Sequence, residues 1–492
     1  ALTSIGVTEG STVAVMDWDS HRYLEAYYAV PMMGAVLHTI NVRLSPEQMV
    51  YTIDHAEDDV IICHTEFLPL LEGIRGRIAE GRKFILIDEG GEIFKNHFQF
   101  EGEYEQMLAE ASPVFDFPEF DENTMATTFY TTGTTGLPKG VYFSHRQLVL
   151  HTLSTTAALA ANSVQGRLHR ESIYMPLTPM FHVHAWGIPY IATFLGTKQV
   201  YPGKYVPAML LKLLETHKVT FSHCVPTILN MLLKDPASLR CDLSRWTCII
   251  GGAALPRVLA LEALKRGIDI FAGYGMSETC PVLSLSQLTE KELELSPEEQ
   301  ADLRIRTGRS IGMAQMRVVD MEGNDVPCDD KTPGEIIVRS PYLTQGYLKD
   351  HVHSEKLWVG GWMHTNDVAC LNPSGSIRIT DRTKDVIKVG GEWLSSLEME
   401  DVIAKHHGIS EVAVIAAPDT TWGEIPLAII VPKGSADFDD REILQIVKSS
   451  VDSGVLPREA ITMKVLRTDI IDKTSVGKVN KVALRTKFLS GM

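Results

Sequence analysis

Short apolar runs alternate with longer amphipathic segments over the first half of the chain. Runs of strand length lie at 60–63, 84–88, 127–130, 141–144, 172–176, 220–225 and 247–250. Between several of them, apolar residues recur at helical spacing, at 207–217, 226–234 and 256–265. This alternation predicts parallel sheets covered by helices, which is an α/β fold.

From about residue 308 the pattern changes to short strands and turns, with strands expected at 317–320, 334–339 and 376–380. Beyond residue 380, a further set of elements predicts a small α+β domain, with helices at 396–406 and 441–451 and strands at 411–416, 427–431 and 461–466. We therefore predict an N-terminal domain over 1–380, a β subdomain within it over 308–380, a polar hinge at 381–385 and a C-terminal domain over 386–492.

Composition narrows the class of protein. A chain of 492 residues, 45% of them hydrophobic, is long enough for at least two domains. The formal net charge of −16 argues against a nucleic acid partner, because such a partner needs a basic face. The seven Cys form no CxxC pair, so we expect thiols in a reducing, cytoplasmic compartment. We expect neither a signal peptide nor a membrane span, because long apolar runs are missing from the sequence.

The most informative motif is TTGTTGLPKGV at 131–141. Its hydroxyls, its glycine backbone and one fixed cation provide the chemistry that grips a polyphosphate. It is not a Walker loop, because Gly140 rather than Ser or Thr follows Lys139. A flexible linker is the alternative. The candidate phosphate-binding residues are Thr131, Thr132, Gly133, Thr134, Thr135 and Lys139.

Two further motifs supply candidate nucleotide and substrate contacts. In FAGYGMSET at 271–279, Tyr274 can stack on an adenine ring and Glu278 offers an oxygen to Mg²⁺. GGAALP at 251–256 follows an expected strand, at the strand end where parallel sheets bind ligands. A strand-ending turn is the alternative in both cases. The candidates from these motifs are Gly252, Ala253, Gly273, Tyr274, Gly275, Met276, Glu278 and Thr279.

The second half of the chain carries charged groups suited to a nucleotide. The Asp367 carboxylate can accept both ribose hydroxyl protons, and the guanidinium of Arg382 keeps its charge beside it. In IDKTSVGKVNK at 471–481, a lysine could stabilise the negative charge that develops as a carboxylate attacks an α-phosphate. A flexible basic tail is the alternative for this last motif.

Together these motifs resemble, in order, those of the AMP-forming acyl-CoA synthetase superfamily, which includes acyl-CoA ligases, beetle luciferases and peptide-synthetase adenylation domains. The resemblance runs from about residue 6 to residue 481. It implies that Lys478 is the catalytic lysine of adenylation and that Glu278 holds the metal. The sequence departs from the family pattern at Asn366 and Asp381, where Gly is commoner, and at Asp472, where Pro is usual.

Other roles are implied by the resemblance alone. Lys384 corresponds to a hinge about which the C-terminal domain swings. The face that meets the CoA thiol would contain Lys388, Gly390 and Gly391. The carboxylate would be gated by His182, and the acyl pocket would be lined by Trp186, His223, Gly252, Gly275 and Met276. A metal site at His182 and His184 is disfavoured because no third ligand is spaced to join them, whereas a core role for Trp186 stays open.

The function expected from the resemblance is an ATP-dependent carboxylate–CoA ligase that uses ATP, Mg²⁺ and coenzyme A, with a medium-chain fatty acid as substrate. Short-chain, sulfur-containing and aryl carboxylates are the alternatives, as is transfer of the acyl group to a carrier protein or to luciferase-like oxygen chemistry. A non-enzymatic nucleotide sensor is disfavoured because so many reacting groups occur together. A homodimer is possible in this family.

Overall fold

The computed structural model describes residues 1–90, 94–131, 137–390, 392–434, 438–473 and 479–489. The chain divides into two compact units, each with its own sheets and its own apolar core. The first unit comprises Ala1–Gln315 with Arg339–Trp358, and the second comprises Met316–Val338 with Val359–Met492. The expected boundary at 381–385 stays a prediction.

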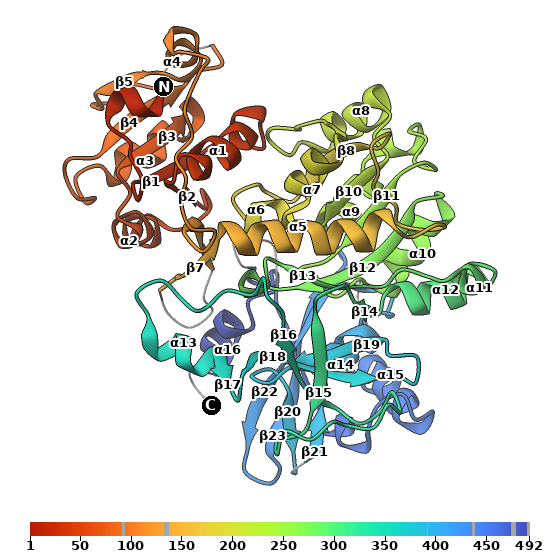
Figure 1. Cartoon of the computed structure of the whole chain (residues 1–492). Helices are drawn as coiled ribbons and strands as arrows, with labels where there is room; N and C mark the ends of the chain where they lie inside the picture. Colours follow the sequence, from red (N-terminus) through yellow and green to blue (C-terminus); the bar gives the residue numbers. More distant parts are fainter. Residues whose placement is uncertain (91–93, 132–136, 391, 435–437, 474–478, 490–492) are drawn as a thin grey trace. The chain divides into compact units, whose positions relative to one another are not determined.

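The first sheet of the first unit has the strand order β5-β4-β3-β1-β2-β6-β7 (Figure 1, red to orange). Its neighbouring strands are parallel except β6 and β7, which form an antiparallel pair. The strands are β1 (Thr12–Met16), β2 (Val36–Thr39), β3 (Val60–His64), β4 (Lys83–Ile87), β5 (Phe100–Glu103), β6 (Met125–Thr131) and β7 (Lys139–Ser144). The accompanying helices are α1 (His21–Met32), α2 (Pro46–Ala56), α3 (Leu68–Ile74), α4 (Tyr104–Glu110) and α5 (His145–Ala160).

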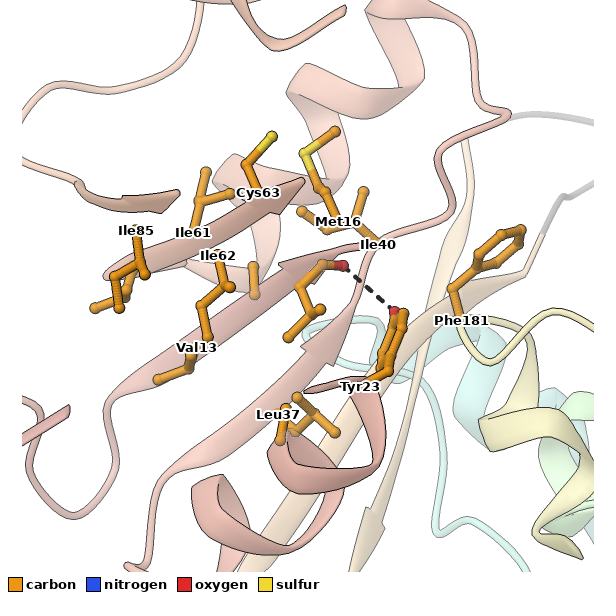
Figure 2. Packing of buried hydrophobic residues seen from close by; sticks show 14 of the residues in the cluster. Val13, Met16, Tyr23, Leu37, Ile40, Ile61, Ile62, Cys63, Ile85 and Phe181 are labelled. Atoms are coloured by element: carbon orange, nitrogen blue, oxygen red, sulfur yellow. Dashed lines mark hydrogen bonds between the residues drawn. The ribbon is translucent and has the colours of Figure 1, made fainter. Parts of the chain in front are cut away.

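The core of this sheet consists of strands buried at every position, as β1 and β3 are. Such strands are typical of parallel sheets with both faces covered. Figure 2 shows part of this cluster, in which Tyr23 of α1 donates a hydrogen bond of 3.3 Å to the Val15 carbonyl oxygen. Phe181, which follows β8 of the second sheet, belongs to the same cluster, so the two sheets share this part of the core.

The second sheet has the order β14-β13-β12-β11-β10-β8-β9, parallel from β9 to β12 and antiparallel beyond. Its strands are β8 (Ile173–Leu177), β9 (Lys198–Gln199), β10 (Phe221–Cys224), β11 (Thr247–Ile250), β12 (Asp269–Gly275), β13 (Val282–Leu285) and β14 (Arg309–Ser310). The remaining helices of the first unit are α6 (Val183–Trp186), α7 (Ile188–Leu195), α8 (Pro207–His217), α9 (Pro226–Lys234), α10 (Arg257–Lys265), α11 (Glu290–Leu293), α12 (Pro297–Arg304) and α13 (His351–Leu357).

The second unit holds two smaller sheets. One has the order β15-β16-β18-β17 with β19 beside β18, and the other the order β21-β20-β23-β22 with β24 beside β23. The strands are β15 (Gln315–Val319), β16 (Gly334–Arg339), β17 (Trp358–Val359), β18 (Trp362–Leu371), β19 (Ile377–Arg382), β20 (Ile387–Val389), β21 (Glu392–Leu394), β22 (Ile409–Asp419), β23 (Gly423–Pro432) and β24 (Lys464–Arg467). The helices are α14 (Ser396–Ile403), α15 (Asp440–Asp452) and α16 (Lys481–Leu489).

These sheets confirm the expected α/β fold. The strand expected at 461–466 is wrong at its start, because Arg458–Thr462 forms a 3₁₀ turn and β24 begins at Lys464. Within the described part of the chain, no helix has the length and apolar character needed to cross a membrane.

Candidate active site

The phosphate-loop motif connects the paired strands β6 and β7. Thr131 pairs with Lys139 at the two ends of the loop, and the Thr131 hydroxyl lies 3.5 Å from the Lys139 carbonyl oxygen. A side chain at Gly140 would be crowded, because a Cβ would lie 3.1 Å from both the Leu348 Cβ and the Tyr130 ring. The hairpin therefore fixes both ends of the loop. The remaining candidates of this motif lie outside the described residues: Thr132, Gly133, Thr134 and Thr135.

A cluster of aromatic and imidazole rings packs against Tyr130 at the end of β6. The Tyr130 hydroxyl lies 2.8 Å from His55 Nδ1, and the Tyr130 ring contacts the ring of His38. Burial raises the pKa of Tyr130 and lowers the pKa of His55, which Lys349 lowers further, so both groups are neutral at pH 7. His38 in turn is paired with buried Asp58 at 2.9 Å. The two groups of this cluster that lie nearest the loop, Tyr130 and His55, are therefore uncharged.

Glu278 lies in a 3₁₀ turn directly after β12 and is only 7% exposed. Tyr347 donates a hydrogen bond of 2.8 Å to Glu278 Oε1, and the Thr344 N–H donates one of 3.0 Å to the Glu278 carbonyl oxygen. Gly275 precedes the turn, and a Cβ there would lie 1.8 Å from the Pro281 carbonyl oxygen. Glycine is therefore obligatory at this position. The Glu278 carboxylate provides hard oxygen donors, which fit Mg²⁺.

Tyr347 also contacts the lysine of the phosphate motif, and the sequence did not reveal it. Lys139 Nζ lies 4.7 Å from the centre of the Tyr347 ring, and the neighbouring Leu348 N–H donates a 2.8 Å hydrogen bond to the Gly140 carbonyl oxygen. Burial raises the pKa of Tyr347, as does its negative neighbour Glu278. A Gly-Tyr pair in a loop gives no signal by itself, because only the fold brings it to these two motifs.

Other residues of the 271–279 motif hold the turn and the strand end. Tyr274 is half-buried and pairs with Ser284 of β13. Thr279 is fully buried, and its hydroxyl accepts a hydrogen bond of 3.0 Å from the Met276 N–H. Thr279 therefore fixes the turn, while the half-buried Met276 and Tyr274 are the members available to a ligand.

The GGAALP motif meets Trp186 at the carboxyl end of β11. A Cβ on Gly251 would lie 2.9 Å from Trp186 Cη2 and 2.9 Å from the Gly273 carbonyl oxygen. Gly252 has a φ of 74°, a left-handed conformation that favours glycine, and Ala253 is exposed. The structure thus brings the predicted residues Trp186, Gly252 and Gly273 into one region.

His223 lies beneath Trp186, with ring centres 4.8 Å apart. Its Nε2 is hydrogen-bonded to the Tyr174 hydroxyl at 2.7 Å, and its Nδ1 lies 3.2 Å from the Thr178 hydroxyl. Burial lowers the pKa of His223 to about 3, so the ring is uncharged. Both nitrogens are therefore used within the sheet, and the fully buried ring packs against Trp186 and Tyr174.

Four consecutive non-glycine residues before α7 have left-handed backbone angles. Val183, His184, Ala185 and Trp186 have φ values of 48°, 51°, 47° and 60°. Each such residue costs roughly 1–2 kcal/mol, and strain of this kind persists where the surroundings determine the conformation. His182, half-buried, begins this turn, and Trp186 ends it, so the strain is stored in the segment expected to face the acyl group.

His184 points into the core rather than toward a metal. Its Nε2 lies 2.7 Å from the Thr127 hydroxyl, and burial lowers its pKa to about 3. Among the described residues, no group of His, Cys, Asp and Glu is arranged to hold a metal ion.

Asp367 and Arg382 lie directly opposite each other on β18 and β19. Arg382 Nε is 3.2 Å from Asp367 Oδ1, and the Asp367 side chain is 7% exposed whereas that of Arg382 is 59% exposed. Asn366 has a φ of 59°, which explains why glycine is common at this position and why Asn is tolerated. The structure brings the predicted pair together.

The predicted hinge and thiol-facing residues lie near the start of the small domain. Lys384 is exposed, and its carbonyl oxygen accepts a hydrogen bond of 3.1 Å from Arg485 of α16. Lys388 is exposed on β20, with its Nζ 5.9 Å from the centre of the Trp393 ring. Gly390 has a φ of 61°, and its N–H donates a 2.8 Å hydrogen bond to the Trp422 carbonyl oxygen. Gly391 lies outside the described residues.

Lys478 also lies outside the described residues, but the base of its loop is defined. Lys473 and Val479 form an isolated bridge across it. Lys481 then begins α16, and its Nζ lies 2.8 Å from Glu400 Oε1 and 2.5 Å from the Ser396 hydroxyl. This buried ion pair was also missed, because the sequence pattern gives Lys481 the appearance of one more basic residue in a tail.

Comparisons with known proteins agree with this geometry. A family described as "AMP-binding enzyme" matches residues 1–348, and one described as "AMP-binding enzyme C-terminal domain" matches residues 398–478. The fold is similar to that of a crystal structure of an anthranilate CoA ligase with anthranoyl-AMP, with a TM-score of 0.84 at 23% identity over 100% of this chain and 90% of that chain.

The relatives that share more than a third of their aligned residues with the chain include three with different named substrates. They are a long-chain-fatty-acid–CoA ligase of Thermus thermophilus (39% identity), a 3-methylmercaptopropionyl-CoA ligase of Ruegeria lacuscaerulensis (37%) and a medium-chain-fatty-acid–CoA ligase of Ectopseudomonas oleovorans (34%). Each alignment covers 99% of this chain and 87%, 89% and 88% of the respective relative.

The fold and the site thus define an acid–thiol ligase of the AMP-forming acyl-CoA synthetase type, which activates a carboxylate with ATP and transfers it to CoA. The chain belongs to the AMP-binding enzyme family. This confirms the expected enzyme class and the use of ATP and CoA.

Proposed function

We propose that the ligase acts on a medium-chain fatty acid. The observation that carries this proposal is the uncharged cluster at the carboxyl end of the second sheet, where Trp186, Gly251 and the neutral ring of His223 meet. A neutral, largely apolar environment of this kind suits an alkyl chain better than an acyl group with a second charge. The names of the long-chain and medium-chain relatives support a fatty acid, and that of the second supports a medium chain.

A short sulfur-containing acid is the second candidate. Trp186 is packed against Gly251, and a side chain of this size next to the expected acyl group would favour a short acid. One of the relatives is named for 3-methylmercaptopropionate, a short acid. Substitution of Trp186 by a smaller residue would extend the accepted chain length in either case.

In the first half-reaction, the loop residues Thr131–Thr135 and Lys139 bind the phosphates, Tyr274 contacts adenine, and Asp367 with Arg382 orients the ribose. Glu278 would hold Mg²⁺, which neutralises phosphate charge when bound. Lys478 stabilises the charge that develops on the α-phosphate as the carboxylate attacks and pyrophosphate leaves. One preorganised cation of this kind contributes on the order of 10² to 10³ in rate.

In the second half-reaction, rotation about Lys384 removes Lys478 and presents the face formed by Lys388, Gly390 and Gly391. The CoA thiolate then attacks the acyl carbonyl, forming the thioester and releasing AMP. His182 would gate the carboxylate at the pocket. We further propose a cytoplasmic location, consistent with seven free thiols, and a homodimer, which sedimentation analysis would test.

The decisive experiment measures pyrophosphate release with ATP and Mg²⁺ across acids from acetate to palmitate, with benzoate and 3-methylmercaptopropionate included, each with and without CoA. A CoA-stimulated maximum for acids of about six to ten carbons supports the medium-chain proposal. A maximum at 3-methylmercaptopropionate would instead establish the short-acid candidate, and a maximum at benzoate would contradict both.

A further inference from the structure

One loop segment, Tyr342–Asp350, connects the two motifs that the sequence assigns to ATP. We call it the bridging segment. Its backbone donates hydrogen bonds to the Glu278 carbonyl oxygen from Thr344 and to the Gly140 carbonyl oxygen from Leu348. Lys349 extends the contact to α2, with its Nζ 3.0 Å from the His55 carbonyl oxygen and 2.9 Å from Glu57 Oε1. Contacts that do not involve the Tyr347 side chain therefore already hold the bridging segment at both motifs.

The side chain of Tyr347 makes two different contacts from this position. Its hydroxyl donates to Glu278 Oε1 at 2.8 Å, and its ring lies 4.7 Å from Lys139 Nζ. Because the two partners have opposite charges, a phenol suits both: the O–H favours the anion and the negative ring face favours the cation. The backbone of Tyr347 is separately held by the Ser354 hydroxyl, which accepts its N–H at 2.8 Å.

We propose that Tyr347 is a positioning residue that orients the carboxylate of Glu278 for Mg²⁺ and the ammonium of Lys139 for the phosphates of ATP. The proposal rests on the proposed function of those two residues. By holding one carboxylate oxygen at 2.8 Å, the hydroxyl restricts the orientations that the Glu278 carboxylate can adopt toward a metal. The contact with the ring restricts the Lys139 side chain, so less of its conformational freedom is lost when ATP binds.

This role predicts that the two halves of the side chain act on different ligands. Tyr347→Phe removes the hydroxyl but keeps the ring, so the Mg²⁺ concentration for half-maximal ATP binding should rise about tenfold, whereas Lys139 keeps its partner. Tyr347→Leu removes both contacts and should weaken ATP binding at saturating Mg²⁺ by a further factor of about three.

The experiment titrates the full chain with ATP by calorimetry at a series of Mg²⁺ concentrations, for the wild type and both variants. Tyr342→Phe is the matched control, because it removes a buried hydroxyl of the same segment that bonds the Val282 carbonyl oxygen and not Glu278. Its thermal stability is expected to fall while its Mg²⁺ dependence stays that of the wild type. Calorimetry needs no carboxylic acid, so an inactive panel of acids would count against the proposed function without affecting this test.

A double-mutant cycle completes the test. In a Glu278→Gln background, Tyr347→Phe should no longer alter the Mg²⁺ dependence, because the hydroxyl acts through the carboxylate. An Mg²⁺ dependence of Tyr347→Phe within twofold of the wild type, or equal shifts for Tyr347→Phe and Tyr342→Phe, would overturn the proposal. Equal effects of Tyr347→Phe in both backgrounds would also overturn it.

Discussion

The two lysine-bearing loops of this enzyme rest on different supports. The loop at 131–141 is supported by neutral groups, since Tyr130 and His55 exchange a hydrogen bond beneath it and Tyr347 lies against Lys139. The loop at 471–481 rests on buried charges, where Lys481 pairs with Glu400. Both loops are expected to bind the same nucleotide, so the support is not dictated by the ligand.

The two supports differ in how much stability is lost when one partner of the contact is removed. A neutral hydrogen bond contributes about 1 kcal/mol, and its loss is moderate. A buried ion pair contributes little net stability, yet removal of one partner leaves an uncompensated charge and is severe. In the second unit, burial also raises the pKa of Glu400 and of Asp381, while Lys481 opposes both shifts. Substitution of one supporting residue should therefore cost more stability at the loop at 471–481 than at the loop at 131–141.

The largest effect is expected for Lys481→Met. The variant leaves Glu400 without its cation and should destabilise the second unit by about 3–5 kcal/mol, as measured by urea unfolding. Lys487→Met is the control, because its bridge to Asp472 is long and exposed. Adding Glu400→Leu should restore most of the loss, and no recovery would contradict the argument.

Lys478→Ala should lower acyl-adenylate formation by about 10² to 10³, since one preorganised cation is lost, with thioester formation from a supplied acyl-adenylate changed little. Rapid-quench measurement of both half-reactions separates these steps. Lys473→Ala, in the same loop, removes only an exposed bridge to Glu411 and should leave both rates near the wild type. Equal loss in both half-reactions would exclude the assigned role.

Tyr130→Phe should raise the KM for ATP several-fold, because the support of the first loop loses one hydrogen bond worth about 1 kcal/mol. Steady-state kinetics at saturating acid measure this effect. Tyr142→Phe, in the adjacent strand β7, leaves that hydrogen bond in place and is the control. A change in kcat alone would show that the hydroxyl does not act through ATP binding.

The smallest effect concerns pH. Burial lowers the pKa of His55 in the folded state, so the neutral form is favoured there. The associated stability is present above the ordinary value of 6.5 and is lost as the pH falls from that value toward the folded-state pKa. His55→Gln should therefore reduce the fall in Tm between pH 7 and pH 5. Parallel Tm curves for His55→Gln and the wild type would contradict this.

Sequence motifs predicted the parts of the site that are contiguous in the chain. The pairing of Asp367 with Arg382 could be expected because both residues lie in motifs of charged groups. Tyr347 could not, because it contacts Glu278 across 69 positions of sequence. Lys481 lies 85 positions from Ser396, and its burial depends on α14 and α16 packing in the folded unit. Supporting residues of this kind are determined by tertiary structure rather than by local pattern.

The left-handed turn at Val183–Trp186 has a consequence for protein engineering. At most positions glycine weakens a fold, but at Ala185 it would relieve an unfavourable backbone angle without losing a large side chain. Libraries that vary acyl-chain preference through Trp186 would therefore start from a more tolerant scaffold if they carried Ala185→Gly. The same turn would also make insertions and deletions between His182 and Gly187 unusually disruptive for directed evolution.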